Sequence, residues 1–190
     1  MTQTVIHFHR TTTLTPEQFV AGLTDFGPGR SKIFGNSSDK YLKVHYRGSF
    51  EADVTEGSYG IWERLHYDWS DPDRVLVTTT DSNVWGAPSW YSYISARLPN
   101  GKTDIDVVVV RDSKNLKGRV LAYLLLTIGR GVLERAFEKS IKAIEARNCA
   151  ASRWRGSIGG AQGFPMRCSS AGSSSVWVHS CAVAQPESTD

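Results

Sequence analysis

Charged side chains alternate with apolar ones in a strand-like segment near the middle of the chain, and these are the first candidates for chemistry. Alternate side chains of an extended strand point to opposite faces. Glu63 then shares a face with Leu65 and Tyr67, whereas His66 and Asp68 share the other face. A carboxylate in a cavity can orient a ligand hydroxyl or act as a general base, and a histidine beside a carboxylate can act as an oriented base. Glu63 and His66 are therefore weak catalytic candidates, against the alternatives that an arginine pairs with Glu63 and that His66 faces solvent.

Aromatic residues gather in a later segment that contains Trp85, Trp90, Tyr91 and Tyr93. Aromatic walls with a few hydroxyl groups suit a pocket for a flat or hydrophobic ligand, and the same residues suit ordinary core packing. Together with residues of neighbouring strands and of the long helix, this cluster predicts a ligand cavity between the sheet and that helix. Its predicted residues are Tyr46, Phe50, Glu63, Leu65, Tyr67, Val77, Thr79, Trp85, Trp90, Ser92, Ile94, Val107, Leu124 and Ile128.

Other motifs give no cofactor or metal site. His7 and His9 are two residues apart and could face one ion, but a zinc site needs three or four protein ligands and no third ligand has matching spacing. The glycine-rich segment that ends at Arg30 lacks the Gly-Lys-Ser/Thr ending of a phosphate-binding loop. We therefore expect no metal and no cofactor.

Composition excludes several classes of protein. The 190 residues carry a formal charge of only +3, with basic residues scattered among acidic ones, which argues against a nucleic-acid binder. The N-terminal segment lacks the basic and apolar regions of a signal peptide, so we expect a cytoplasmic location. No run approaches the about 20 apolar residues of a membrane-spanning helix, so no transmembrane segment is expected.

The last part of the chain differs from the rest. All three cysteines follow Asn148, and the segment from Cys149 is rich in glycine and serine without a useful hydrophobic period. We predict a domain over residues 1–148 and a disordered Ser/Gly-rich tail over residues 149–190, in which residues 176–178 are the only strand-like stretch.

Secondary-structure signals place strands before one long helix. A first strand is expected over Thr4–Thr12, followed by a helix that begins with a Thr15–Gln18 capping box around Pro16, and by a short helix over residues 30–34. Further strands are expected over residues 41–47, with one face half-buried, and over 50–55, 59–69, 74–81, 88–98 and 102–111. Short connections between them predict an antiparallel meander.

Turn residues support this arrangement. The sequence Pro99-Asn100-Gly101 predicts a hairpin with a type I′ turn. The sequence Glu56-Gly57-Ser58 predicts another turn. In the last strand, the alternation predicts that Ile105, Val107 and Val109 face the core.

The long helix is expected from Leu116 to Arg147, and its two halves differ. Its second half has apolar residues on one face, including Leu133, Phe137 and Ile141, which predicts an ordinary covering helix. Its first half, residues 120–128, is apolar nearly all round and needs a cover: protein, a ligand, a weak homodimer contact or a membrane surface. Gly129 and Gly131 indicate a kink or a close approach to the backbone.

This order of elements resembles the START-like, or SRPBCC, superfamily, as do the segments 59–69, 71–74 and 99–103. The most similar branch is the polyketide cyclase/dehydrase and lipid transport type, and the resemblance covers residues 1–148. It implies an α+β helix-grip fold, in which a curved antiparallel sheet surrounds a long C-terminal helix beside two short N-terminal helices. It carries no shared catalytic motif.

Three functional hypotheses follow, and the sequence does not decide whether the protein is an enzyme. The first is binding or transport of a small hydrophobic or amphipathic ligand, lipid or polyketide-like, in a cavity between sheet and helix. The second is a polyketide cyclase or dehydratase in which Glu63, His66 or a tyrosine moves protons. The third is a protein-interaction module that docks through the apolar half of the helix and the tryptophan-rich loop around residues 83–88.

Overall fold

The computed structural model describes residues 3–158, 168–170 and 179–181. Its strands are β1 (Thr4–Thr12), β2 (Lys43–Arg47), β3 (Glu51–Ser58), β4 (Ile61–Asp68), β5 (Arg74–Ser82), β6 (Trp85–Arg97), β7 (Thr103–Ser113), β8 (Cys168–Ser170) and β9 (His179–Cys181). Its helices are α1 (Pro16–Leu23), α2 (Arg30–Ile33), α3 (Leu116–Leu124), the π-helix η1 (Leu125–Gly129) and α4 (Arg130–Ile158).

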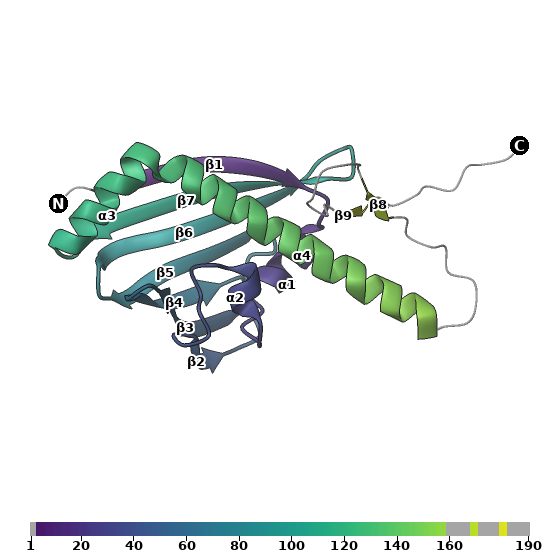
Figure 1. Cartoon of the computed structure of the whole chain (residues 1–190), viewed down its shortest axis with the longest axis horizontal. Helices are drawn as coiled ribbons and strands as arrows, with labels where there is room; N and C mark the ends of the chain where they lie inside the picture. Colours follow the sequence, from purple (N-terminus) through teal and green to yellow (C-terminus); the bar gives the residue numbers. More distant parts are fainter. Residues whose placement is uncertain (1–2, 159–167, 171–178, 182–190) are drawn as a thin grey trace, which may run out of the picture.

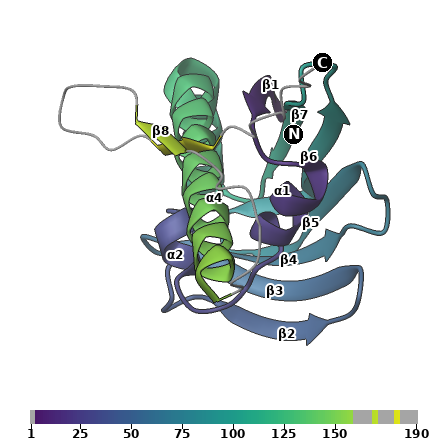
Figure 2. The same cartoon turned by 90° about the vertical axis from the view of Figure 1, so that its right-hand side faces the viewer.

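Seven strands form one antiparallel sheet in the order β1-β7-β6-β5-β4-β3-β2. The sheet curves, and the long helix crosses its concave face diagonally, as Figure 1 shows. In Figure 2, where α4 stands upright, the strands follow one another from β1 to β2 around one side of the helix, with α1 and α2 beside it. The predicted α+β helix-grip architecture is therefore confirmed.

The core lies between the concave face and α4 because one parity of each strand is apolar. On β7, Ile105, Val107 and Val109 are buried, as the alternation predicts. On α4, Ile141 and Ile144 are buried against the same core. The sheet therefore presents a continuous apolar surface that the helix covers, and this burial drives the packing.

The capping box at the start of α1 is also as predicted. Thr15 accepts a hydrogen bond from the backbone of Gln18, whose side chain accepts one from the backbone of Thr15. These bonds satisfy backbone donors that a helix N-terminus leaves unpaired. The helix ends at Leu23, and the chain then turns into α2.

Three strand predictions need correction. The segment of β2 is exposed at every position rather than half-buried, because β2 is an edge strand. The turn after β3 lies at Tyr59 and Gly60, both with positive φ, and not at residues 56–58, which belong to the strand. In the hairpin before β7, Gly101 has positive φ but Asn100 does not, so the turn is not type I′.

The long helix is interrupted at the predicted glycine. Residues Leu125–Gly129 form a π-helical turn, and a Cβ atom on Gly129 would lie 2.9 Å from a side-chain carbon of Leu125. Glycine therefore allows the wider turn to close without a clash. The helix continues to Ile158, beyond the predicted end at Arg147.

The apolar first half of the long helix is exposed, which corrects the interpretation that the protein's own elements cover it. Leu116 is 75% exposed, and Tyr123 and Ile128 are each 66% exposed. The other exposed apolar residues of this segment are Val120, Leu124 and Leu126.

The predicted domain boundary at residue 148 falls inside α4, where Cys149 is buried and disulfide-bonded. Within the predicted tail, β8 and β9 form an antiparallel pair. The rest of residues 159–190, including the strand-like stretch 176–178, lies outside the described residues, so the tail assignment stays a prediction. No helix in the described part of the chain has the length and hydropathy to span a membrane.

Candidate functional site

A cavity of about 240 Å³ lies between the concave face of the sheet and α4. Strands β1 and β3 to β7 supply one wall and helix α4 supplies the other. Residues of α1 and α2 and residues 34–36 complete the lining. The lining residues are Phe8, Leu23, Arg30, Phe34, Gly35, Asn36, Glu56, Leu65, Tyr67, Val77, Tyr91, Tyr93, Val107, Val109, Leu133, Ala136, Phe137 and Ser140. The cavity is therefore mostly apolar with a few polar groups, as ligand pockets commonly are.

Strand register brings the aromatic wall together. Val77 pairs with Tyr67 on one side and with Tyr91 on the other, and Tyr91 pairs in turn with Val109. Directly opposed residues of neighbouring antiparallel strands point to the same face. These four side chains consequently form one row across the concave face. Tyr93 follows two residues after Tyr91 on that face and stacks on Phe137 of α4, with ring centroids 5.9 Å apart.

A buried ion pair forms one polar end of the cavity. The Arg30 Nε atom donates to the Glu56 carboxylate, and the two side chains are 1% and 5% exposed. The Tyr67 hydroxyl donates to Glu56 Oε2 at 3.0 Å and accepts from Arg30 at 3.2 Å. Arg30 also lies 4.6 Å from the ring centroids of Phe26 and Phe34, a cation–π geometry. The charges are therefore compensated and the tyrosine is held in place.

Two cavity tyrosines remain neutral well above ordinary pH. Burial, reinforced by the negative charge of Glu56, raises the pKa of Tyr67 well above its usual value. Burial also raises the pKa of Tyr93. The Tyr93 hydroxyl makes no hydrogen bond within the part of the chain that the structure describes. Tyr93 is therefore the hydroxyl available to a ligand.

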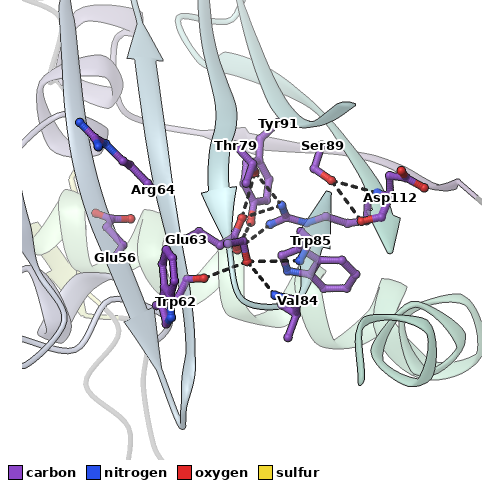
Figure 3. Close-up of polar contacts among 12 residues, drawn as sticks. Glu56, Trp62, Glu63, Arg64, Thr79, Val84, Trp85, Ser89, Tyr91 and Asp112 are labelled. Atoms are coloured by element: carbon purple, nitrogen blue, oxygen red, sulfur yellow. Dashed lines mark hydrogen bonds and ion pairs between the residues drawn. The ribbon is translucent and has the colours of Figure 1, made fainter. Parts of the chain in front are cut away.

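A second buried network lies on the same face of the sheet. Arg111 binds the carboxylate of Glu63 through two hydrogen bonds, of 2.8 and 3.2 Å. Thr79 donates to Glu63 at 3.0 Å, and the hydroxyl of the cavity residue Tyr91 donates at 3.3 Å. Figure 3 shows Glu63, Thr79 and Tyr91 converging, while the neighbouring Arg64 points away.

Aromatic rings complete the surroundings of Arg111. Its guanidinium carbon lies 3.9 Å from the ring centroid of Tyr91 and 5.1 Å from that of Trp85. Burial lowers the pKa of Arg111, and the charge of Glu63 opposes this effect. Because Glu63 is engaged on all sides, it resembles a structural anion more than a free base. The alternative that an arginine pairs with Glu63 holds.

Of the residues predicted for the cavity, Leu65, Tyr67, Val77 and Val107 line it. Glu63, Thr79 and Trp85 belong to the Arg111 network instead, and of these three Glu63 accepts a hydrogen bond from the cavity residue Tyr91.

The other predicted cavity residues lie elsewhere. On β6, Tyr91 and Tyr93 face the cavity, so the alternate residues Trp90, Ser92 and Ile94 face the opposite side of the sheet. The prediction that Trp90, Ser92 and Ile94 line the cavity therefore chose the wrong face of β6. Both faces of this strand carry aromatic residues, so the sequence pattern did not distinguish them.

Four further residues are exposed and do not line the cavity. Tyr46 and Phe50 are 50% and 61% exposed because they lie on and beside the edge strand β2. Leu124 and Ile128 lie on the exposed side of the helix around η1. Leu124 and Ile128 therefore belong to an exposed apolar surface of the helix and not to the cavity.

His66 lies on the convex face and not in the cavity. Its Nδ1 atom is 3.0 Å from Asp53 Oδ1, and Glu51 lies 3.9 Å away. The alternative of a solvent-facing histidine therefore holds. Among the described residues, no group of three or more histidine, cysteine or acidic side chains is arranged to hold a metal ion.

Sequence reasoning missed Arg30, Glu56 and Arg111. A local signal for two of them was present, since Glu56 shares strand parity with buried Val54, and Arg111 shares parity with buried Val109. A charged residue at a strand position whose neighbours on the same face are apolar indicates a buried ion pair. Arg30 had no comparable signal, because it follows a glycine-rich turn.

The comparisons with known proteins identify the fold. No protein-family model and no curated protein matches the sequence significantly. Among solved structures, the Zhui aromatase/cyclase from Streptomyces sp. R1128 superposes with a TM-score of 0.61 at 13% identity, over 79% of this chain and 98% of that chain. A START superfamily protein from Mycobacterium smegmatis gives 0.50 at 8% identity, over 71% and 98%.

A norcoclaurine synthase from Thalictrum flavum gives a TM-score of 0.55 at 10% identity, over 75% of this chain and 87% of that chain. These identities are too low to transfer an activity, but the shared architecture covers nearly the full length of each neighbour. The chain therefore has the START-like helix-grip fold, which confirms the predicted resemblance to the START-like, or SRPBCC, superfamily at the level of the fold.

Proposed function

We propose that the protein binds a small aromatic or amphipathic molecule in the cavity between the sheet and α4. The observation that carries this proposal is the apolar cavity with the Tyr93 hydroxyl on its wall, which has no hydrogen-bond partner among the described residues. Its volume of about 240 Å³ lies below the usual range of about 300–1,000 Å³ for drug-sized ligands, which favours a molecule of one or two rings.

The polar groups of the cavity define the ligand further. A neutral tyrosine donates a hydrogen bond, so Tyr93 suits a ligand hydroxyl or carbonyl oxygen. Arg30 and Glu56 neutralise each other, so this pair presents no net charge to a ligand. One solved norcoclaurine synthase contains dopamine and hydroxybenzaldehyde, small aromatic molecules with oxygen substituents, which is compatible with this ligand class.

The first test is a fluorescence titration with 2-naphthol, a two-ring aromatic alcohol. Ala136→Trp places an indole at the cavity and should weaken 2-naphthol binding by roughly tenfold or more, because it removes the space for the probe. The matched control is Ala146→Trp, because both alanines are exposed on the same helix and Ala146 does not line the cavity. Equal affinities of the two variants would contradict the proposal.

Tyr93→Phe tests the hydrogen bond separately. The variant keeps the ring and removes only the hydroxyl, so its affinity for 2-naphthol should fall by about two- to tenfold, the equivalent of one neutral hydrogen bond. Its affinity for naphthalene, which has no oxygen, should not fall. A parallel loss for both probes would show that Tyr93 acts through packing alone.

A cyclase or dehydratase is the second candidate, and one observation favours it. The Tyr67 hydroxyl and the Glu56 carboxylate are hydrogen-bonded at the cavity wall, where an acid and a base can move protons on a bound chain. If so, the protein should convert a linear poly-β-ketone thioester to a ring with loss of water. Tyr67→Phe and Glu56→Gln should abolish this turnover, and unchanged product formation in both would exclude the two residues.

A further inference from the structure

A second feature, separate from the cavity, is the exposed apolar segment of α3 and η1. We name it the α3–η1 patch, and it consists of Leu116, Val120, Tyr123, Leu124, Leu126 and Ile128. Each is between 44% and 75% exposed. Single exposed apolar residues are common, but six on consecutive helical turns form a surface typical of an interaction site.

Basic residues flank this patch without acidic ones. Between Ser113 and Leu133 the sequence contains Lys114, Lys117, Arg119 and Arg130, and no aspartate or glutamate. Two of the four are neutralised locally, since Lys114 pairs with Asp81 and Arg130 pairs with Glu134.

The other two basic residues, Lys117 and Arg119, have no acidic partner among the described residues. The patch therefore combines an apolar surface with a net positive charge.

Basic and apolar side chains together line a hollow of about 550 Å³ at the start of α3. Lys114 and Arg119 line it together with Leu116, Tyr123 and Leu126 of the patch. A hollow lined by basic and apolar groups matches a molecule with an anionic head and a hydrocarbon portion. It lies at the opposite end of the helical region from the cavity, whose helix residues are 133–140.

We propose that the α3–η1 patch binds the surface of an anionic membrane, with the helix lying along the interface. Helices that lie in a membrane interface present apolar side chains to the acyl chains and basic side chains to anionic headgroups. The patch has both, and its charge is complementary to a surface of anionic lipid. This inference does not depend on the proposed function, because it uses none of the cavity residues.

The test is co-sedimentation with vesicles of phosphatidylcholine alone and of phosphatidylcholine with phosphatidylglycerol at three to one. The protein should sediment with the anionic vesicles at low salt and much less with the neutral ones. Raising the salt to about 0.5 M should release it, because screening removes the electrostatic attraction. Equal sedimentation with both kinds of vesicle would overturn the role of charge.

Variants locate the contact. Val120→Ser with Tyr123→Ser should reduce partitioning by roughly tenfold, because it removes apolar area from the interface. Lys117→Gln with Arg119→Gln should reduce it by about 25-fold, at about fivefold for each basic residue near an anionic surface. The matched controls are Phe50→Ser and Lys139→Gln, which alter an exposed aromatic and an exposed lysine outside the patch and should leave partitioning unchanged.

Two outcomes would overturn the proposal. One is wild-type protein that does not sediment with anionic vesicles. The other is a homodimer in light scattering that the Val120→Ser with Tyr123→Ser variant dissociates, since a second copy would then occupy the patch. Far-UV circular dichroism and a cooperative urea transition show that the variants are folded, so loss of membrane binding is distinguishable from unfolding and from failure of the cavity.

Discussion

Breaking the ion pair between Arg111 and Glu63 should destabilise the fold more than removing both charges together. The two side chains are 5% and 13% exposed and share two hydrogen bonds. Arg111→Met leaves the Glu63 carboxylate buried with only the hydroxyl groups of Thr79 and Tyr91 as partners. Removal of one partner of a buried pair typically costs 3–5 kcal/mol, so we expect a loss of about 4 kcal/mol in the free energy of unfolding.

The double variant has a different expected cost. Arg111→Met with Glu63→Gln removes both charges and keeps side chains of similar size, so no charge remains uncompensated in the core. Replacement of a whole buried pair is often close to neutral, and we expect a loss of about 1–2 kcal/mol. The two single losses should therefore exceed the loss of the double variant by several kcal/mol.

Urea denaturation followed by circular dichroism measures these values for the wild type, both single variants and the double variant. The coupling energy from this double-mutant cycle is the quantity of interest. A coupling energy near zero, with additive losses, would refute the interpretation of the pair as a buried structural unit. It would leave Glu63 free for a role in ligand chemistry.

Three shorter predictions concern other parts of the fold. Gly118→Ala should lower the free energy of unfolding by about 1–2 kcal/mol, because the added Cβ would lie 2.2 Å from the Val84 carbonyl oxygen; unchanged stability in urea would contradict this close approach. Burial acts to raise the pKa of Asp25, but the Gly27 amide and Arg147 outweigh it, so the folded pKa is lowered and its stabilisation is lost as the pH falls below about 4. Arg147→Gln should reduce this acid dependence by less than about 1 kcal/mol in denaturation at pH 7 and pH 3, and an identical pH profile would exclude the contact. His66→Ala should leave 2-naphthol affinity unchanged, since His66 lies on the convex face, and a weaker affinity would contradict that placement.

Local patterns predicted the features that depend on neighbouring residues. The bounds of β1, the capping box at Thr15 and the inward residues of β7 each follow from a period of two or from a short hydrogen-bonding motif. The helix-grip order follows from a meander of strands before one long helix. Patterns of this kind are physical consequences of strand and helix geometry, so one sequence suffices to reveal them.

The candidate site required contacts that no local pattern contains. Arg30 and Glu56 are 26 positions apart, and Glu63 and Arg111 are 48 positions apart. The sequence also did not show which face of β6 lines the cavity. Trp90 and Tyr91 are both aromatic, and the strand shifts register between Gly86 and Trp90. Only the curvature and register of the whole sheet decide which side chains meet.

The central claim is that a small aromatic ligand occupies the cavity rather than the α3–η1 patch. Isotope-edited NMR on methyl-labelled protein with bound 2-naphthol tests it most directly, because nuclear Overhauser effects report contacts shorter than about 5 Å. We expect effects between the probe and the methyl groups of Val77, Val107 and Leu133, which line the cavity. Effects confined to the methyl groups of Leu116 and Val120, or none at all, would contradict the account.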